Sequence, residues 1–284
     1  MAETARQGAM SIDVEDWFHV ENLKRVVPRG TWAERELRVE RNTDLMLGML
    51  DEHGAHATFF VLGWVAERCP SLLERIAAGG HEIASHGYGH DLLGDLTPDE
   101  FRADVTRSKA LLEDRAGRAV RGYRAPSFSI TDWAIPILRN LGFEYDSSVF
   151  PTLAHDRYGR LPGIAAGKPT VELAPGFHEV CISCLPLGSR GLPWGGGGYF
   201  RLLPYAVFRR GVARIQASGV PYVFYIHPWE LDPGQPRVDG LARSHRFRHY
   251  VGLERAEARW GSLLRDFRWT TVADVLAGSL RREH

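Results

Sequence analysis

The stretch 56–85, HATFFVLGWVAERCPSLLERIAAGGHEIAS, contains the pattern that decides the fold. Residues 56–63 form an apolar run rich in aromatic and β-branched side chains, which is typical of a buried strand. Residues 70–80 begin with Pro70 and end with two glycines, as helices commonly do, and residues 81–85 form a second short apolar run. Strand, helix and strand in this order predict a parallel βαβ unit.

The same alternation of strand-like and helix-like segments extends through the first half of the chain. Strands are expected at 9–13, 120–126 and 143–148, and helices at 43–54, 97–117 and 131–142. The clearest helix is 97–117, where Thr97 and Glu100 have the spacing of a capping box and Pro98 occupies the first helical position. Repeated βαβ units of this kind predict an α/β protein with a parallel sheet.

The composition changes between about residues 150 and 200, where proline, glycine and short β-like runs dominate. This predicts a loop-rich β insertion rather than a separate domain. The later elements are expected to be a helix at 204–219, a strand at 221–228, a helix at 247–267 and a closing segment at 269–280. In the helix at 131–142, we expect Thr131 to cap the first turn and Pro136 to bend the axis.

The length of 284 residues suits one α/β barrel, so we expect a flexible N-terminus at 1–9 and a single domain at 10–284. The 35 basic residues balance the 35 acidic ones, and this zero net charge argues against a nucleic-acid partner. No run of 18 apolar residues predicts a membrane segment, and no signal-peptide core precedes the domain. We therefore expect a cytoplasmic protein. The sequence does not indicate the oligomeric state.

The three cysteines do not form a disulfide framework or a complete zinc cage. Cys181 and Cys184 have a spacing found in redox motifs and half zinc sites, but no second pair accompanies them. Because "VCISC" resembles a strand, we interpret both as ordinary thiols, like Cys69.

Polar side chains follow several of the predicted strands at the point where each strand ends. They are Asp13, Glu15, Asp16 and Trp17; His86 and His90; Arg124 and Pro126; Asp146; and His227, Trp229 and Glu230. Each has an ordinary structural explanation when taken alone, such as capping for the aspartates or a surface ion pair for the arginine. The carboxyl ends of parallel strands meet at one edge of a sheet, so the joint pattern favours a single functional site.

The residue types in this set suit metal-assisted hydrolysis. Two neutral imidazoles and a carboxylate are typical ligands of zinc, and such a set also accepts cobalt, nickel, manganese or iron. A second carboxylate can take a proton from water, and a further histidine can protonate a leaving amine. We expect Arg124 to orient that second carboxylate and to favour its ionised form.

Six ordered motifs resemble the NodB-homology polysaccharide deacetylases, carbohydrate esterase family 4. They are SIDVEDW, ATFFVLG, GHEIASHGYGH, RGYRAPSFSI, YDSSVFP and YIHPWE. The segment GGGGYFRLLPY and the tail also resemble the branch tied to bacterial exopolysaccharide clusters, and the similarity runs from about residue 10 to residue 275. The resemblance implies a distorted (β/α)7 barrel that hydrolyses N-acetyl groups on the sugars of a glycan with a divalent metal.

Transferred motif by motif, the resemblance assigns a role to individual residues. Asp13 takes the place of the general base, His86 and His90 those of metal ligands, and His227 that of the general acid. Arg124 takes the place of the arginine that positions the base. Asp146 either holds the acid histidine or only closes a loop.

The sequence departs from the family pattern in two places. The usual pair of adjacent aspartates is replaced by Asp13, Val14, Glu15 and Asp16, so the metal carboxylate is either Glu15 or Asp16. Alternation along an extended strand places Asp13 and Glu15 on one side, which favours Glu15, whereas a turn after Val14 would present Asp16. Gly87 stands where the family has Ser or Thr, and Ser85 could supply the missing hydrogen bond.

The substrate contacts implied by the resemblance are less specific. A backbone N–H of Ser127 or Phe128 would bind the oxyanion, and aromatic rings would stack on sugars. The residues expected on the substrate side are Trp17, Ser127, Phe128, Asp146 and Trp229, with Trp194 and Tyr199 as further aromatic candidates. Three other functions stay open: hydrolysis of a cyclic ureide such as allantoin, glycan binding without catalysis, and a structural zinc site.

Overall fold

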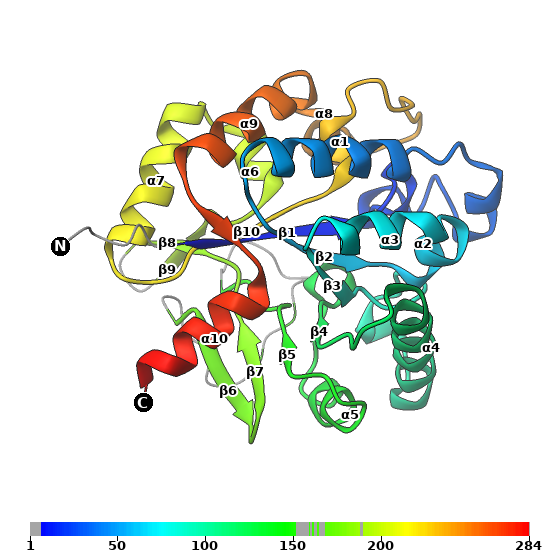
Figure 1. Ribbon diagram of the computed structural model, residues 1–284. Helices are drawn as coiled ribbons and strands as arrows, with labels where there is room; N and C mark the ends of the chain where they lie inside the picture. The colour runs from blue at the N-terminus through cyan, green and yellow to red at the C-terminus, as the bar shows by residue number, and fades with distance from the viewer. Residues whose placement is uncertain are drawn as a thin grey trace.

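The computed structural model describes residues 7–151, 159, 161, 164, 168–187 and 190–283. Its main feature is a sheet with the strand order β10-β1-β2-β3-β4-β5-β7-β6, to which β11 adds beside β1 (Figure 1). The strands are β1 Gly8–Val14, β2 Thr58–Val61, β3 Glu82–Ser85, β4 Gly122–Tyr123, β5 Tyr145–Asp146, β6 Thr170–Ala174, β7 Phe177–Val180, β10 Val223–Ile226 and β11 Trp269–Thr270. All neighbours are parallel except β6 and β7, and the sheet curls into the distorted barrel that the sequence predicted.

Helices surround this sheet in the described part of the chain (Figure 1). They are α1 Val39–Glu52, α2 Gly63–Arg68, α3 Pro70–Ala78, α4 Pro98–Ala116, α5 Ala134–Asn140, α6 Gly197–Leu202, α7 Tyr205–Ala217, α8 Arg243–Tyr250, α9 Ala256–Asp266 and α10 Val272–Glu283. None of them is long and apolar enough to span a membrane. The capping box at the start of α4 is confirmed, since Thr97 accepts from the Glu100 amide and Glu100 accepts from Thr97.

Alternating strand residues build two apolar layers. Met10 and Ile12 of β1 belong to the larger layer between the sheet and the outer helices, whereas Ala9 belongs to a smaller cluster with Phe60 and Ala84. Val272, Val275 and Leu276 of α10 complete that smaller cluster. The backbone of α10 also hydrogen-bonds to the first residues of β2 and β3, so this helix closes the amino end of the barrel and leaves the carboxyl end open.

The segment after β7 links the residues that follow β5 to the edge strand β10. The Ile182 amide donates to the Val149 carbonyl on one side, and Ser183 exchanges hydrogen bonds with Val223 of β10 on the other. The Tyr225 amide donates to the Gly195 carbonyl, so residues from the predicted insertion cover the outer edge of β10. The described part of 150–200 thus contains β6, β7 and α6 together with a hairpin of β8 Cys184–Leu187 and β9 Arg190–Pro193, while the remainder lies outside the described residues.

Four local predictions need correction. Strand β1 begins at Gly8, inside the segment expected to be flexible, while residues 1–6 lie outside the described chain. Helix α5 begins only at Ala134, so Pro136 lies in its first turn, where proline does not bend a helix. Thr131 accepts through its backbone carbonyl rather than capping with its side chain.

The helix expected at 247–267 is two helices, α8 and α9. The break occurs at Gly252, whose φ of 70° cannot continue a right-handed helix. The three cysteines are buried free thiols, as expected.

Candidate active site and metal centre

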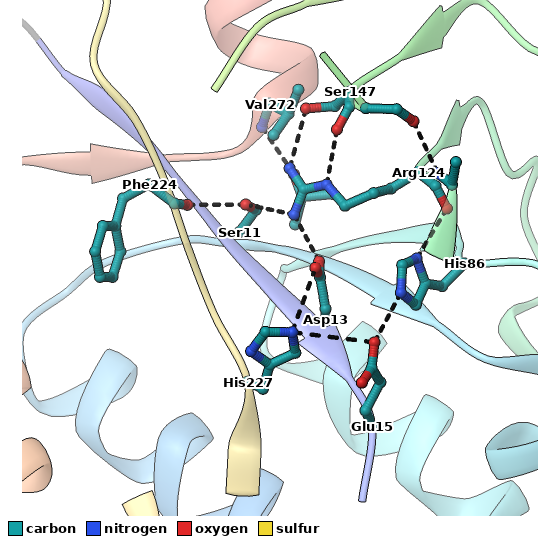
Figure 2. A network of polar contacts seen from close by, with 12 residues as sticks. Ser11, Asp13, Glu15, His86, Arg124, Ser147, Phe224, His227 and Val272 are labelled. Atoms are coloured by element: carbon teal, nitrogen blue, oxygen red, sulfur yellow. Dashed lines mark hydrogen bonds and ion pairs between the residues drawn. The ribbon is translucent and has the colours of Figure 1, made fainter. Parts of the chain in front are cut away.

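The predicted site residues meet at the carboxyl end of the barrel, as Figure 2 shows for Asp13, Glu15, His86, Arg124 and His227. Asp13 lies on β1 and Glu15 directly follows it, while the other three come just after β3, β4 and β10. Parallel pairing of β1 with both β2 and β10 brings these loops to one edge of the sheet. Residues more than 200 positions apart in sequence therefore face one another.

Glu15, His86 and His90 form a compact cluster of potential metal ligands. Their ligand atoms all lie within 4.8 Å of one another, and all three side chains are buried. Oε1 of Glu15 is 2.9 Å from Nε2 of His86 and 2.9 Å from Nε2 of His90. Burial disfavours a charged Glu15, but the neighbouring imidazoles, His90 and His227 first among them, hold the pKa of this carboxyl well below its usual value.

The hydrogen-bond partners of His86 indicate that a cation fits this cluster. Nδ1 of His86 lies 2.8 Å from the Arg124 carbonyl, which can only accept, so this nitrogen carries the proton. In the neutral ring Nε2 then carries no proton and directs its lone pair at Glu15. Two hydrogen-bond acceptors, Nε2 of His86 and Oε1 of Glu15, thus lie 2.9 Å apart. Tetrahedral zinc with bonds of about 2.0–2.1 Å would hold its ligand atoms about 3.3 Å apart, which is close to this arrangement.

Asp16 is not part of this cluster, which corrects its prediction as the alternative metal carboxylate. One oxygen accepts from the Trp17 amide at 2.8 Å, and the other accepts from the amides of Arg38 at 2.6 Å and Val39 at 2.8 Å. Both oxygens are thus occupied by backbone donors at the starts of two helical segments. Burial raises the pKa of Asp16 to about 6 despite these hydrogen bonds.

Asp13 is held by Arg124 in the interior of the barrel. Nη1 of Arg124 lies 2.5 Å from Oδ1 of Asp13, and both side chains are buried. The guanidinium is fixed in turn by the Ser147 carbonyl at 2.8 Å, the Ser147 hydroxyl at 3.0 Å and the Ser11 hydroxyl at 2.9 Å (Figure 2). Its plane also lies over the Phe60 ring at 4.0 Å. One oxygen of Asp13 is therefore immobilised, and the other faces the cavity.

His227 faces both carboxylates from the end of β10, the strand that pairs with β1. Its Nε2 is 3.9 Å from Oδ2 of Asp13 and 4.0 Å from Oε1 of Glu15. Its Nδ1 lies 2.8 Å from Oε1 of Glu230. Burial disfavours the charged ring, but Glu15, Glu230 and Asp13 outweigh it and raise the pKa of His227 to about 9. The side chain is thus a proton donor near neutral pH.

The residue that orients His227 is Glu230, for which no role was predicted. Glu230 is buried and also accepts from Nε of Arg201 at 2.6 Å. Burial opposes its charge, yet Arg201 and His227 lower the pKa of Glu230 to about 2. The spacing of three residues in HPWE was a local signal for the His–Glu contact, whereas Arg201 lies on α6 and is joined only by the fold.

Asp146 does not hold the acid histidine, which corrects one of its two predicted roles. Its carboxyl accepts from the Ser148 hydroxyl at 2.6 Å, and the same hydroxyl accepts from the Ala125 amide at 2.7 Å. Burial raises the pKa of Asp146 to about 6. Burial and the neighbouring Asp146 carboxyl raise the pKa of Glu179 well above its usual value. Asp146 thus supports the loop behind Arg124 and does not reach the substrate side.

A cavity of about 370 Å³ opens beside these residues, within the size range of ligand pockets. Among the predicted substrate contacts, Ser127, Phe128, Trp229 and Tyr199 line it. Trp17 packs edge-on against Phe18 and Trp194 stacks on Phe208, and neither lines the cavity. Trp229 stacks on His227 at 5.2 Å and on His249 at 4.6 Å, so its ring fixes the histidine.

The loops that carry these residues have unusual backbone conformations. Ser127, Phe128 and His90 have φ values of 51°, 58° and 57°, which are rare for residues other than glycine and often mark functional sites. The Phe128 amide already donates to the Ala125 carbonyl, which leaves Ser127 as the better oxyanion candidate of the two predicted. The Ser85 hydroxyl accepts from the Gly87 amide at 3.2 Å and so supplies the hydrogen bond expected of it.

Comparison with known proteins agrees with this fold. The sequence profile of the polysaccharide deacetylase family matches residues 32–145, and a domain of unknown function (DUF3473) matches residues 147–277. Solved structures with the same fold include a Mycobacterium smegmatis protein assigned to the polysaccharide deacetylases, with a TM-score of 0.61 at 22% identity over 100% of this chain and 93% of that one. A carbohydrate esterase family 4 pseudoenzyme from Bacillus anthracis matches with a TM-score of 0.53 at 13% identity over 96% of this chain and 66% of that one.

Similarity to curated proteins defines the family. A chitooligosaccharide deacetylase of Sinorhizobium fredii is 35% identical over 162 residues, which cover 50% of this chain and 75% of that protein. The chain belongs to the polysaccharide deacetylase family. A peptidoglycan-N-acetylglucosamine deacetylase of Bacillus cereus is 38% identical over 84 residues, which cover 30% of this chain and only 30% of that protein. The two profiles meet inside one barrel, because His227 and Glu230 lie in the second region, whereas Glu15, His86 and His90 precede it.

Proposed function

We propose that the protein removes N-acetyl groups from amino sugars of a glycan and releases acetate, with a divalent metal held by Glu15, His86 and His90. The observation that carries this proposal is the placement of two further groups beside that cluster. Asp13 with its arginine and His227 with its glutamate both face the cavity, 3.9 Å apart at their nearest charged atoms. A structural metal site would need a fourth protein ligand and no such acid–base pair.

The relatives support the same reaction class. Their names describe deacetylases of peptidoglycan, chitin and chitooligosaccharide, all of which carry N-acetylated amino sugars. Fold alone would not suffice, since a pseudoenzyme shares it. Asp13, both histidines of the cluster and His227 are all present here, which argues against a purely glycan-binding role. Neither the site nor the relatives favour a cyclic ureide.

The chemistry follows from the position of each group. A divalent ion, with zinc expected, would act as a Lewis acid on the acetamide carbonyl and on a neighbouring water. Oδ2 of Asp13 takes the proton of the attacking water while Arg124 holds the other oxygen. His227 donates its Nε2 proton to the departing amine, and Glu230 stabilises the charged ring before the transfer. We expect the Ser127 amide to stabilise the oxyanion.

The test is acetate release from N-acetylglucosamine oligomers by the metal-loaded protein and by Asp13→Asn. We expect the variant to lose roughly 10²–10⁴-fold in kcat, the usual contribution of a general base. Asp51→Asn, at an exposed position of α1, is the matched control. Unchanged turnover in Asp13→Asn would remove Asp13 from the base role. The link to exopolysaccharide clusters stays a prediction.

A further inference from the structure

Helix α8 carries a positive charge that the balanced composition of the whole chain conceals. The chain has 35 basic and 35 acidic residues, yet Arg243, Arg246 and Arg248 lie on this helix and no acidic residue does. All three arginines are exposed, and none of their guanidinium groups has a carboxylate partner among the described residues. An exposed cationic helix of this kind attracts an anionic partner.

The residues around α8 do not cancel this excess of charge. The helical turn that begins at Glu21 contacts α8, and the Glu21 carboxylate lies 3.8 Å from Lys24. Arg25, the next residue, is exposed and has no carboxylate partner in the described part of the chain. The loop before α8 adds one charge of each sign, from Arg237 and Asp239. The surface formed by α8 and these neighbours therefore stays positive.

An exposed aromatic ring lies between two of the arginines of α8. The side chain of Phe247 is 57% exposed, more than any other large hydrophobic residue in the described chain. Leu202 of α6, which lines the same cavity as Phe247, is 47% exposed. Cationic side chains around a protruding apolar ring are typical of helices that lie at the surface of a bilayer with anionic lipids.

We propose that α8 docks on an anionic membrane surface, with the Phe247 ring among the lipid headgroups and the arginines of the helix against lipid phosphates. Guanidinium groups bind phosphate through paired hydrogen bonds, which suits side chains that have no partner within the protein. The eight residues of α8 span about 12 Å, which is short for the roughly 1,200–2,000 Å² that a specific protein interface buries. A membrane surface needs no such area, because each cation and each inserted ring adds its own contribution.

This docking has a consequence for the cavity. Phe247 and Arg248 line the cavity as well as the exposed face of α8, so the docked protein would hold the cavity mouth at the lipid headgroups. The docking itself is independent of the proposed function. Only the corollary that the glycan is attached to the membrane rests on that function.

Sedimentation of the protein with lipid vesicles at low salt tests the docking. Vesicles of phosphatidylcholine alone are compared with vesicles of equal parts phosphatidylcholine and phosphatidylglycerol. We expect binding only to the anionic vesicles, and we expect added salt to weaken it, because salt screens exposed charges. Arg246→Ala should lower the partition coefficient about fivefold, and Phe247→Ala should lower it about tenfold.

The matched controls are an exposed arginine and an exposed apolar residue elsewhere on the protein. Arg102→Ala removes an arginine of α4 that has no carboxylate partner among the described residues, and Leu45→Ala changes a 37% exposed position of α1. Both should bind the anionic vesicles as the unchanged protein does. Thermal unfolding should be the same for all variants, and Arg243→Ala provides a second cationic variant should Arg246→Ala alter it.

Each outcome decides for or against the docking. Absence of binding, equal binding to both kinds of vesicle, or binding that survives both Arg246→Ala and Phe247→Ala would overturn it. A concentration-dependent dimer in analytical ultracentrifugation that Phe247→Ala abolishes would assign this face to a second copy of the chain instead. Vesicle binding without acetate release from soluble oligomers would leave the docking standing and overturn only the proposed reaction.

Discussion

The assignment of the metal carboxylate to Glu15 rather than Asp16 gives the sharpest prediction, because the two adjacent residues should fail in different ways. Glu15→Gln removes the one charged ligand of the cluster, while Asp16→Asn removes an acceptor of three backbone amides. The first variant should lose metal and keep its fold. The second should keep metal and lose stability.

The magnitudes follow from the contacts. Replacing groups that merely support a metal ligand costs about 10–100-fold in metal affinity, so loss of the Glu15 carboxylate should exceed about 100-fold. Asn at position 16 offers one acceptor oxygen where two are used, so at least one buried amide of Trp17, Arg38 or Val39 loses its partner. One unsatisfied buried donor costs about 1–3 kcal/mol, and Asp16→Asn should lower the free energy of unfolding by that amount.

Elemental analysis after dialysis against limiting zinc measures the first effect, and urea unfolding of metal-free protein measures the second. Measuring unfolding without metal separates the loss of the cap from any loss of ligand stabilisation. If Asp16→Asn lost the metal while Glu15→Gln retained it, the reasoning from the cluster geometry would be refuted.

Two further predictions concern other buried groups. Glu230→Gln should lower kcat by about 10²-fold with little change in KM, because His227 loses its charged partner. The same variant should lower the free energy of unfolding by about 3–5 kcal/mol, because Arg201 keeps a buried charge without its carboxylate. Steady-state kinetics and urea unfolding measure the two effects, and an unchanged kcat would contradict the positioning role. Burial, with smaller effects from neighbouring positive groups, lowers the pKa of His81 from 6.5 to about 4. Between these two pH values the folded state binds fewer protons than the unfolded state, so the free energy of unfolding falls as the pH drops through this range. His81→Gln should flatten this loss in thermal unfolding scans from pH 7 to pH 4.5, and an unchanged slope would contradict the assignment.

The sequence predicted those features that depend on local pattern or on strand ends. The capping box of α4 needs only Thr97 and Glu100, which are three residues apart, and it is present. Asp13 and Glu15 alternate along one strand end, and the structure directs both toward the cavity. The convergence of loops from β1, β3, β4 and β10 followed from the rule that parallel strands share one functional edge.

Features that depend on tertiary packing escaped prediction. The ion pair of Arg201 with Glu230 joins residues 29 positions apart, and nothing in either local sequence signals the partner. Asp146 lies at a strand end, as Arg124 and His227 do, but its carboxyl is directed toward Glu179 instead of the cavity. The aromatic residue Trp194 was a reasonable sugar platform by type, yet Phe208 covers its face.

The pairing of β1 with β10 has a consequence for how the chain folds during synthesis. Residues 9–12 pair with residues 223–226, so one flank of the first strand stays bare until most of the polypeptide has emerged from the ribosome. Contacts of such large sequence separation form slowly, and a bare strand edge is a template for aggregation. Ribosome stalling before residue 223 should therefore yield a nascent chain that requires a chaperone, even though β2, the partner on the other flank of β1, has already been synthesised.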